Sequence, residues 1–117
     1  MLADPQVLTV NAVDKTMPRI ETGNRRSLYQ TSDELFSAEV SHQSTGKGRV
    51  RSLNKFTEKA VVTDPLSEEN DYDNFYFQIV LDRPSAGFTI TQIQQLWAAI
   101  KSHMDDAYIA KMFGQES

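Results

Sequence analysis

Cysteine is absent from this chain of 117 residues, and histidine occurs only twice, as His42 and His103. The lack of cysteine excludes a disulfide scaffold, a thiolate metal site and a cysteine nucleophile. Neither histidine has carboxylates at a spacing typical of a metal site. Glycine-rich phosphate loops and the serine-hydrolase and zinc-protease motifs are also absent. We therefore expect no enzymatic activity and no metal centre within the chain.

Long apolar runs are missing as well. No segment approaches the ~20 consecutive apolar residues that cross a bilayer. The N-terminal sequence MLADPQVLTV lacks the basic region and apolar core of a signal peptide. The content of 39% hydrophobic and 24% charged residues is typical of a globular protein. We expect a single domain over residues 1–117 with no membrane partner.

Strand patterns precede helical ones along the chain. We expect a β-hairpin within residues 1–22, with strands over 7–10 and 17–20. We expect an antiparallel sheet over residues 27–83, with strands at 27–30, 36–41, 49–62 and 74–81. Because Pro18 has no N–H to donate, the second hairpin strand should lie at an edge or outside the main sheet. Turn residues separate the runs. This order predicts the α+β class, an antiparallel meander followed by helices.

The C-terminal part has helical periodicity. Apolar residues recur at three- and four-residue steps, and this spacing predicts two helices within residues 89–114. The apolar positions of the first helix are Ile90, Ile93, Leu96, Trp97, Ile100 and Met104. Thr89 with Gln92 and Thr91 with Gln94 both fit a capping box. A second helix could begin at Asp105 and stop at Gly114. Two helices on one face of the sheet would leave the other face for solvent or for function.

Basic residues are concentrated in one strand-like segment, although the net charge of the chain is −4. Residues 47–59 carry five cations at odd positions, with only Glu58 opposing them: Lys47, Arg49, Arg51, Lys55 and Lys59. Alternate side chains of a strand share a face, so these five should form one row. Such a row binds phosphates with counterion release.

Neighbouring strands would add polar groups to the same face. Ser37, Ser41 and Gln43 take the polar phase of one strand, and Tyr76 and Gln78 that of another. Hydroxyl and amide groups can read base edges, and a tyrosine ring can stack on an unpaired base. A charged face can also simply keep a sheet soluble. Its nearly uniform positive sign favours nucleic-acid binding.

The layout resembles the coat proteins of levivirus-type single-stranded RNA bacteriophages. The resemblance is carried by the segment 47–56 running into residues 63–65, and by residues 87–91 opening the long helix. It implies an N-terminal hairpin, a five-stranded antiparallel meander and two helices. It further implies a homodimer that completes the sheet and interlocks the helices, in contact through Ile93, Leu96, Trp97, Ile100 and Met104.

The resemblance also implies a function. Dimers would build an icosahedral shell around the single-stranded RNA genome, as a virion assembled in the bacterial cytoplasm. The RNA-facing residues carried over by position are Ser37, Ser41, Gln43, Arg49, Arg51, Lys55, Tyr76 and Gln78. Tyr76 would stack on a base of an RNA hairpin loop, whose binding would repress translation.

Acidic residues are concentrated just after the basic segment, with five carboxylates and no cation over residues 64–73: Asp64, Glu68, Glu69, Asp71 and Asp73. The resemblance implies that this loop meets its copies around the symmetry axes of a shell. Clustered carboxylates repel one another, so we expect assembly to depend on pH or on divalent cations. Structural calcium between subunits is the one cofactor that this loop indicates.

Two other functions remain open at this point. A small dimeric RNA-binding regulator could use the same sheet face without forming a shell. A small α+β ligand-binding or enzymatic domain could hold its pocket between sheet and helices. Sedimentation separates them, because a coat gives megadalton particles with nucleic-acid absorbance, whereas a regulator gives a small dimer that binds RNA.

Overall fold

The computed structural model describes residues 2–116, and the chain divides into two compact units between Arg83 and Pro84. The first unit contains the strands, and the second contains the helices. Neither helix has the length and hydropathy of a membrane-spanning segment within residues 2–116.

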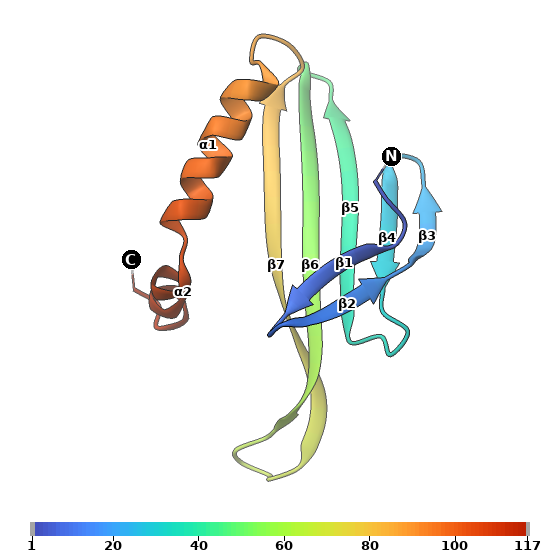
Figure 1. Ribbon diagram of the computed structural model, residues 1–117, viewed down its shortest axis with the longest axis vertical. Coiled ribbons are helices and arrows are strands. Elements are labelled where there is room, and N and C mark those ends of the chain that lie inside the picture. Colours follow the sequence, from blue (N-terminus) through green and yellow to red (C-terminus); the bar gives the residue numbers. More distant parts are fainter. Residues whose placement is uncertain (1, 117) are drawn as a thin grey trace. The chain divides into compact units, whose positions relative to one another are not determined.

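Seven strands form two sheets in the first unit (Figure 1). Strands β1 (Gln6–Val10) and β2 (Val13–Met17) make a two-stranded antiparallel hairpin. The five-stranded sheet follows chain order, with β3 (Arg19–Gly23), β4 (Arg26–Gln30), β5 (Phe36–Thr45), β6 (Arg49–Thr63) and β7 (Asn70–Pro84). The expected α+β fold, with a hairpin, a five-stranded antiparallel meander and two helices, is confirmed.

The hairpin differs in its bounds from the sequence prediction. Asn11 and Ala12 both have positive φ, 51° and 63°, and form a two-residue turn that lets the second strand start at Val13. That strand ends at Met17, so the prediction of a strand over 17–20 is wrong. Pro18 lies between β2 and β3, and its carbonyl accepts a hydrogen bond from the Gln30 N–H at 3.1 Å. The main sheet therefore begins at Arg19 rather than at residue 27.

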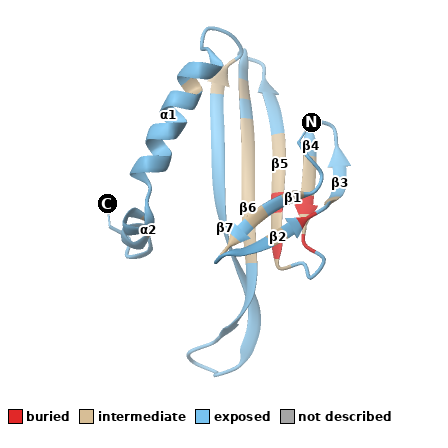
Figure 2. Cartoon of the chain, in the orientation of Figure 1, coloured by how far each residue is buried: buried red, intermediate tan, exposed pale blue. Residues whose placement is uncertain are grey.

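The core lies between the hairpin and the β4–β5 part of the sheet. Four apolar side chains are buried there, Met17, Tyr29, Phe36 and Ala38, and Figure 2 shows the buried positions on β2, β4 and β5. Half-buried side chains from β1, β5 and β6 pack against this cluster, including Leu8, Val40 and Phe56. The hairpin thus covers one face of the sheet.

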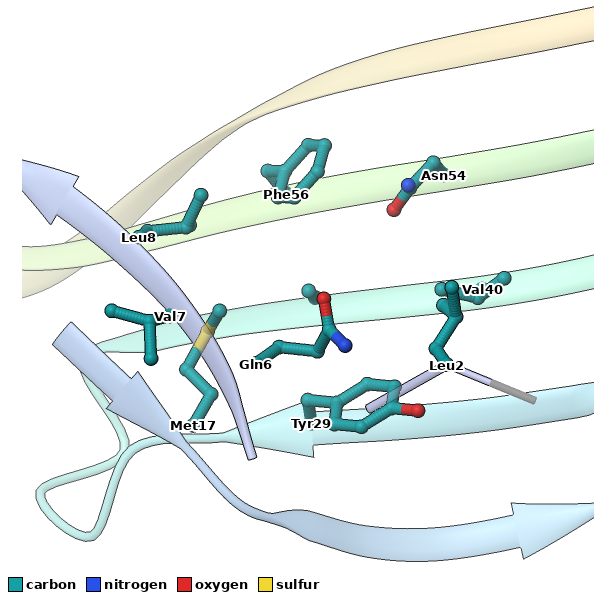
Figure 3. A pocket seen from close by; sticks show the side chains of 10 residues that line it. Leu2, Gln6, Val7, Leu8, Met17, Tyr29, Val40, Asn54 and Phe56 are labelled. Atoms are coloured by element: carbon teal, nitrogen blue, oxygen red, sulfur yellow. The ribbon is translucent and has the colours of Figure 1, made fainter. Parts of the chain in front are cut away.

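A cavity of about 50 Å³ remains beneath the hairpin (Figure 3). Its lining includes Met17, Tyr29, Phe56 and Asn54, whose side-chain oxygen is buried without a hydrogen-bond partner. The Tyr29 hydroxyl accepts hydrogen bonds from the Arg19 guanidinium, at 3.0 Å to Nη2. A cavity of this size holds about one water molecule and leaves no room for a metabolite.

The connection from β4 to β5 is fixed by one carboxylate. The Thr31 hydroxyl donates to Asp33 Oδ1, and the Leu35 N–H donates to the same oxygen at 3.0 Å. These hydrogen bonds, the one from Thr31 first, lower the pKa of Asp33 below its ordinary 3.8. The connection thus holds Phe36 at the start of β5, where its ring enters the core.

The second unit consists of helices α1 (Ile90–His103) and α2 (Asp106–Phe113). Of the two predicted capping boxes, the one at Thr89 is formed: Thr89 Oγ1 accepts from the Gln92 N–H at 3.3 Å, and Gln92 Oε1 accepts from the Thr89 N–H at 3.0 Å. Asp105 caps α2, and Gly114 ends it as expected. Neither helix contains a buried residue.

Candidate nucleic-acid interface

The strand register defines one face of the sheet by alternation. Ser37, Ser41 and Gln43 of β5 stand opposite Thr57, Leu53 and Arg51 of β6. All 10 residues of β5 pair with β6 without a register shift. Odd-numbered residues of β5 and β6 therefore share a face, which we call the basic face.

Contacts from β6 to β7 extend this face. Arg49 Nε donates to Asp82 Oδ1 at 2.9 Å, and Lys55 Nζ lies 4.4 Å from the centre of the Tyr76 ring. Lys59 Nζ lies 5.0 Å from the centre of the Tyr72 ring. Even-numbered residues of β7 therefore belong to the basic face.

The basic face brings together nine of the ten residues that the sequence indicated for RNA binding. They are Ser37, Ser41, Gln43, Arg49, Arg51, Lys55, Lys59, Tyr76 and Gln78. The tenth, Lys47, lies in the turn between β5 and β6, next to Gly48 with φ 71°. The cationic row therefore begins at Arg49, with Lys47 at the end of the sheet.

The expectation of a nearly uniform positive charge on this face is wrong. Glu39, opposite Lys55 on β5, forms an ion pair with Arg26 at 3.0 Å. Asp82 pairs with Arg49 in the same way. The charges of β6 alone predict a cationic row, whereas alternation along β5 and β7 puts both carboxylates on the same face. Within residues 2–116, Arg51, Lys55 and Lys59 have no carboxylate in ion-pair distance.

Tyr72 is a candidate residue that the sequence reasoning missed. Its side chain is 57% exposed and Tyr76 is 52% exposed, so both rings are accessible to a ligand. The sequence pattern places Tyr72 in the acidic loop over residues 64–73, whereas in the structure β7 begins at Asn70 and includes Tyr72. The signal that could have found it is the alternation of Tyr72, Asn74 and Tyr76 along one face.

The opposite face of β7 is apolar over residues 75–81. Phe75 and Phe77 meet edge to face, with ring centres 6.3 Å apart. Ile79 and Leu81 line an open groove of about 230 Å³ together with Val40. These four β7 side chains are 39–54% exposed, so nothing in the first unit buries them. The two faces of β7 thus differ in chemistry: one carries tyrosine and amide groups and the other aliphatic and phenyl groups.

The acidic segment is divided between a turn and a strand. Asp64, Glu68 and Glu69 lie in the turn between β6 and β7, whereas Asp71 and Asp73 lie in β7 on the face opposite Tyr72. The Leu66 N–H donates to Asp64 Oδ1 at 2.9 Å and lowers the pKa of Asp64. Within residues 2–116 of one chain, no three ligand side chains converge on a metal position.

Four of the residues expected at the dimer interface lie on α1, and the fifth, Met104, is its C-cap. Ile93 is half-buried, and Leu96, Trp97, Ile100 and Met104 are 37–65% exposed. Lys101 Nζ lies 5.9 Å from the centre of the Trp97 ring. A helix with this much exposed apolar surface needs a further packing partner.

The fold of this chain, a five-stranded antiparallel sheet followed by two helices, is similar to that of several phage capsid structures. The chain superposes on the subunit of the virus-like particle of bacteriophage AVE019 with a TM-score of 0.80, at 11% identity over 96% of this chain and 94% of that one. The virus-like particle subunit of Beihai levi-like virus 21 gives 0.74 at 13% identity, with 100% and 97% covered. The bacteriophage GA capsid protein gives 0.65 at 14% identity, with 97% and 95% covered.

The family described as "Phage phiCb5, coat protein" matches residues 3–79. Since this match covers more than half of the sequence, the chain belongs to the phage phiCb5 coat protein family, and the resemblance to levivirus-type coat proteins is confirmed. Membership of this coat protein family points to a structural role. No curated protein sequence matches the chain significantly.

Proposed function

We propose that the chain dimerises, assembles into an icosahedral shell and holds single-stranded RNA against its basic face. The observation that carries the proposal is the row of Arg51, Lys55 and Lys59 beside exposed tyrosines, on the sheet face that the hairpin leaves uncovered. Cations without a carboxylate partner neutralise phosphates and release counterions. Membership of a coat protein family supports the shell, the virion location and assembly in the bacterial cytoplasm.

A second copy of the chain would complete the structure of the first. Strand β7 is the last strand of the sheet and is 15 residues long, so its outer edge is open to pairing. Its apolar face and the apolar residues of α1 are both exposed. Two-fold pairing of β7 edges would join the sheets and let each α1 cover its partner's apolar face. Ile93, Leu96, Trp97, Ile100 and Met104 would then lie in the interface.

Polar residues of the basic face would provide any sequence preference. Ser37, Ser41, Gln43 and Gln78 present hydroxyl and amide groups beside the cations. Such groups bond to base edges of unpaired RNA, and Tyr76 offers a ring for stacking. A specific RNA hairpin bound here would allow the coat protein to repress translation.

The turn at residues 64–69 would meet its copies around the symmetry axes of the shell. Each copy brings Asp64, Glu68 and Glu69, and the repulsion among them grows as copies approach. Since no three ligand side chains converge within residues 2–116, calcium would be shared between copies. Particle yield should then rise with calcium or at low pH. Equal yields at pH 5 and pH 8, with calcium and with a chelator, would contradict this dependence.

The decisive experiment is sedimentation with electron microscopy of the purified full chain. Megadalton particles with nucleic-acid absorbance support the coat, whereas a ~27 kDa species that binds RNA would support the rival regulator. The triple substitution Arg49→Gln, Arg51→Gln and Lys55→Gln should lower packaged RNA and the salt dependence of binding while leaving the dimer folded. Lys111→Gln in α2 removes an exposed cation elsewhere and serves as control. Unchanged RNA content in the triple variant would disprove the assignment of the face.

A further inference from the structure

Two lysine–tyrosine pairs repeat along the basic face. Lys55 lies over the Tyr76 ring at 4.4 Å, and Lys59 lies over the Tyr72 ring at 5.0 Å. The lysines are four residues apart on β6, and the tyrosines are four residues apart on β7. At ~3.3 Å per residue, the two pairs are separated by about 13 Å along the strands. The face thus carries the same combination of groups twice.

Each pair combines the two groups that a single nucleotide needs. A tyrosine ring stacks on an unpaired base, and an ammonium group neutralises the adjoining phosphate. In the free protein the lysine occupies the ring face. A cation–π contact at an exposed site is weaker than the stacking of a base. A base can therefore displace the lysine, whose flexible stem lets the ammonium move to the phosphate.

The surroundings of the second pair leave room for a ligand. The last β5–β6 pair is Phe36 with Glu58, and the Lys59 N–H donates to the Leu35 carbonyl at 2.8 Å. The second pair therefore lies at the end of β5, beyond which β6 and β7 continue without it (Figure 1), and Tyr72 is 57% exposed. Alternation puts Thr57 and Asn74 on the basic face between the two pairs. Their hydroxyl and amide groups can bond to the edge of a base lying between the two rings.

We propose that Lys59 and Tyr72 form a second nucleotide subsite beside Lys55 and Tyr76, and that the two subsites select unpaired over base-paired RNA. In a duplex the base faces are stacked on one another, so the rings have no base to bind. The inference rests on the proposed RNA-binding function of the basic face. It adds Tyr72 as a residue that contacts RNA and assigns a separate nucleotide to Lys59.

The test compares a fluorescein-labelled 12-nucleotide oligouridylate with a 12-base-pair RNA duplex, each titrated with the purified full chain over a series of salt concentrations. Tyr72→Leu should weaken binding of the single strand about fivefold or more, leaving the salt slope and duplex binding unchanged. Lys59→Gln should weaken both ligands and reduce the salt slope for the single strand by about 0.7. Phe113→Leu, at the end of α2 and 92% exposed, is the control for loss of a ring.

The outcomes separate this inference from the function on which it rests. If the wild type binds neither ligand, the proposed function fails. If Tyr76→Leu and Lys55→Gln weaken binding while Tyr72→Leu stays within twofold of wild type, only the second subsite is disproved. Equal weakening of single strand and duplex by Tyr72→Leu would also overturn it, because that result indicates a structural role.

A measurement on the wild type covers the case in which Tyr72→Leu does not fold. RNA containing 4-thiouridine is cross-linked by light, and the attached residues are located by tandem mass spectrometry. Cross-links at both Tyr72 and Tyr76 support two subsites. Cross-links at Tyr76 with none at Tyr72 overturn the proposal.

Discussion

The two halves of the five-stranded sheet differ in how many of their side chains are buried within the chain. The half around β4 and the start of β5 contributes Tyr29, Phe36 and Ala38 to a core that the hairpin closes. The half formed by β6 and β7 has no buried residue, although these strands are the longest, at 15 residues each. One half has a core within the chain, and in the proposed dimer a second copy would cover the other. The candidate RNA-binding chemistry lies mainly in the half without a core.

The largest difference between the halves should be seen when a tyrosine is removed from each. Tyr29→Ala empties the core and should lower the free energy of unfolding by about 3–5 kcal/mol. Tyr72→Ala removes a ring from an exposed position and should change it by less than about 0.5 kcal/mol. Urea unfolding of both variants at equal protein concentration measures the change in the free energy of unfolding. Similar losses would mean that the two halves are equally buried in the assembled protein.

The second prediction concerns the apolar face of β7. Leu81→Asp puts a charge where a second copy should pack, and should weaken dimerisation by about 100-fold. Val80→Asp adds the same charge to the same strand on the basic face and should leave the dimer intact. Analytical ultracentrifugation over a range of concentrations distinguishes them. If both variants dimerise like wild type, β7 is not the interface.

The third prediction concerns the carboxylates of the basic face. Asp82→Asn frees Arg49 from its ion pair and removes a negative charge, so RNA affinity should rise up to about tenfold, with a steeper salt dependence. Asp71→Asn removes the same charge from the opposite face and should have little effect. Binding of oligouridylate at several salt concentrations measures both. A weaker affinity in Asp82→Asn would mean that Asp82 positions Arg49 for RNA.

The smallest expected effect is at the β4–β5 connection, in the half with the core. The pKa of Asp33 is lowered by folding, so its ionised form stabilises the protein above the unfolded pKa, and this stability is lost as pH falls through the folded pKa. Asp33→Asn should therefore lower Tm by a few degrees at neutral pH, and the difference should shrink as pH falls below about 4 and through the folded pKa. Glu34→Gln removes a neighbouring exposed carboxylate as control. A Tm difference that stays constant from neutral pH down to the lowest pH at which the protein folds would contradict the role of the charge.

The sequence predicted the order and type of the elements well, because strand alternation and helical periodicity are strong over 36–62 and 90–104. It misplaced the second hairpin strand, since Asp14 and Lys15 resemble a loop and the positive φ of Ala12 leaves no mark in the sequence. The partners of the cationic row were harder to predict. Glu39, Asp82 and Tyr72 come from neighbouring strands, and their place on the face depends on the register.

If the proposed shell holds RNA on the basic face, the ion pairs of Glu39 and Asp82 would affect how the RNA is released. A shell repeats each contact many times along one polymer, so even weak attachment at a single subunit accumulates to firm retention. Two fixed carboxylates beside the cations keep the individual attachment modest. In the proposed shell, the genome would therefore be held by the number of contacts, and it could be withdrawn one subunit at a time once its end is pulled free.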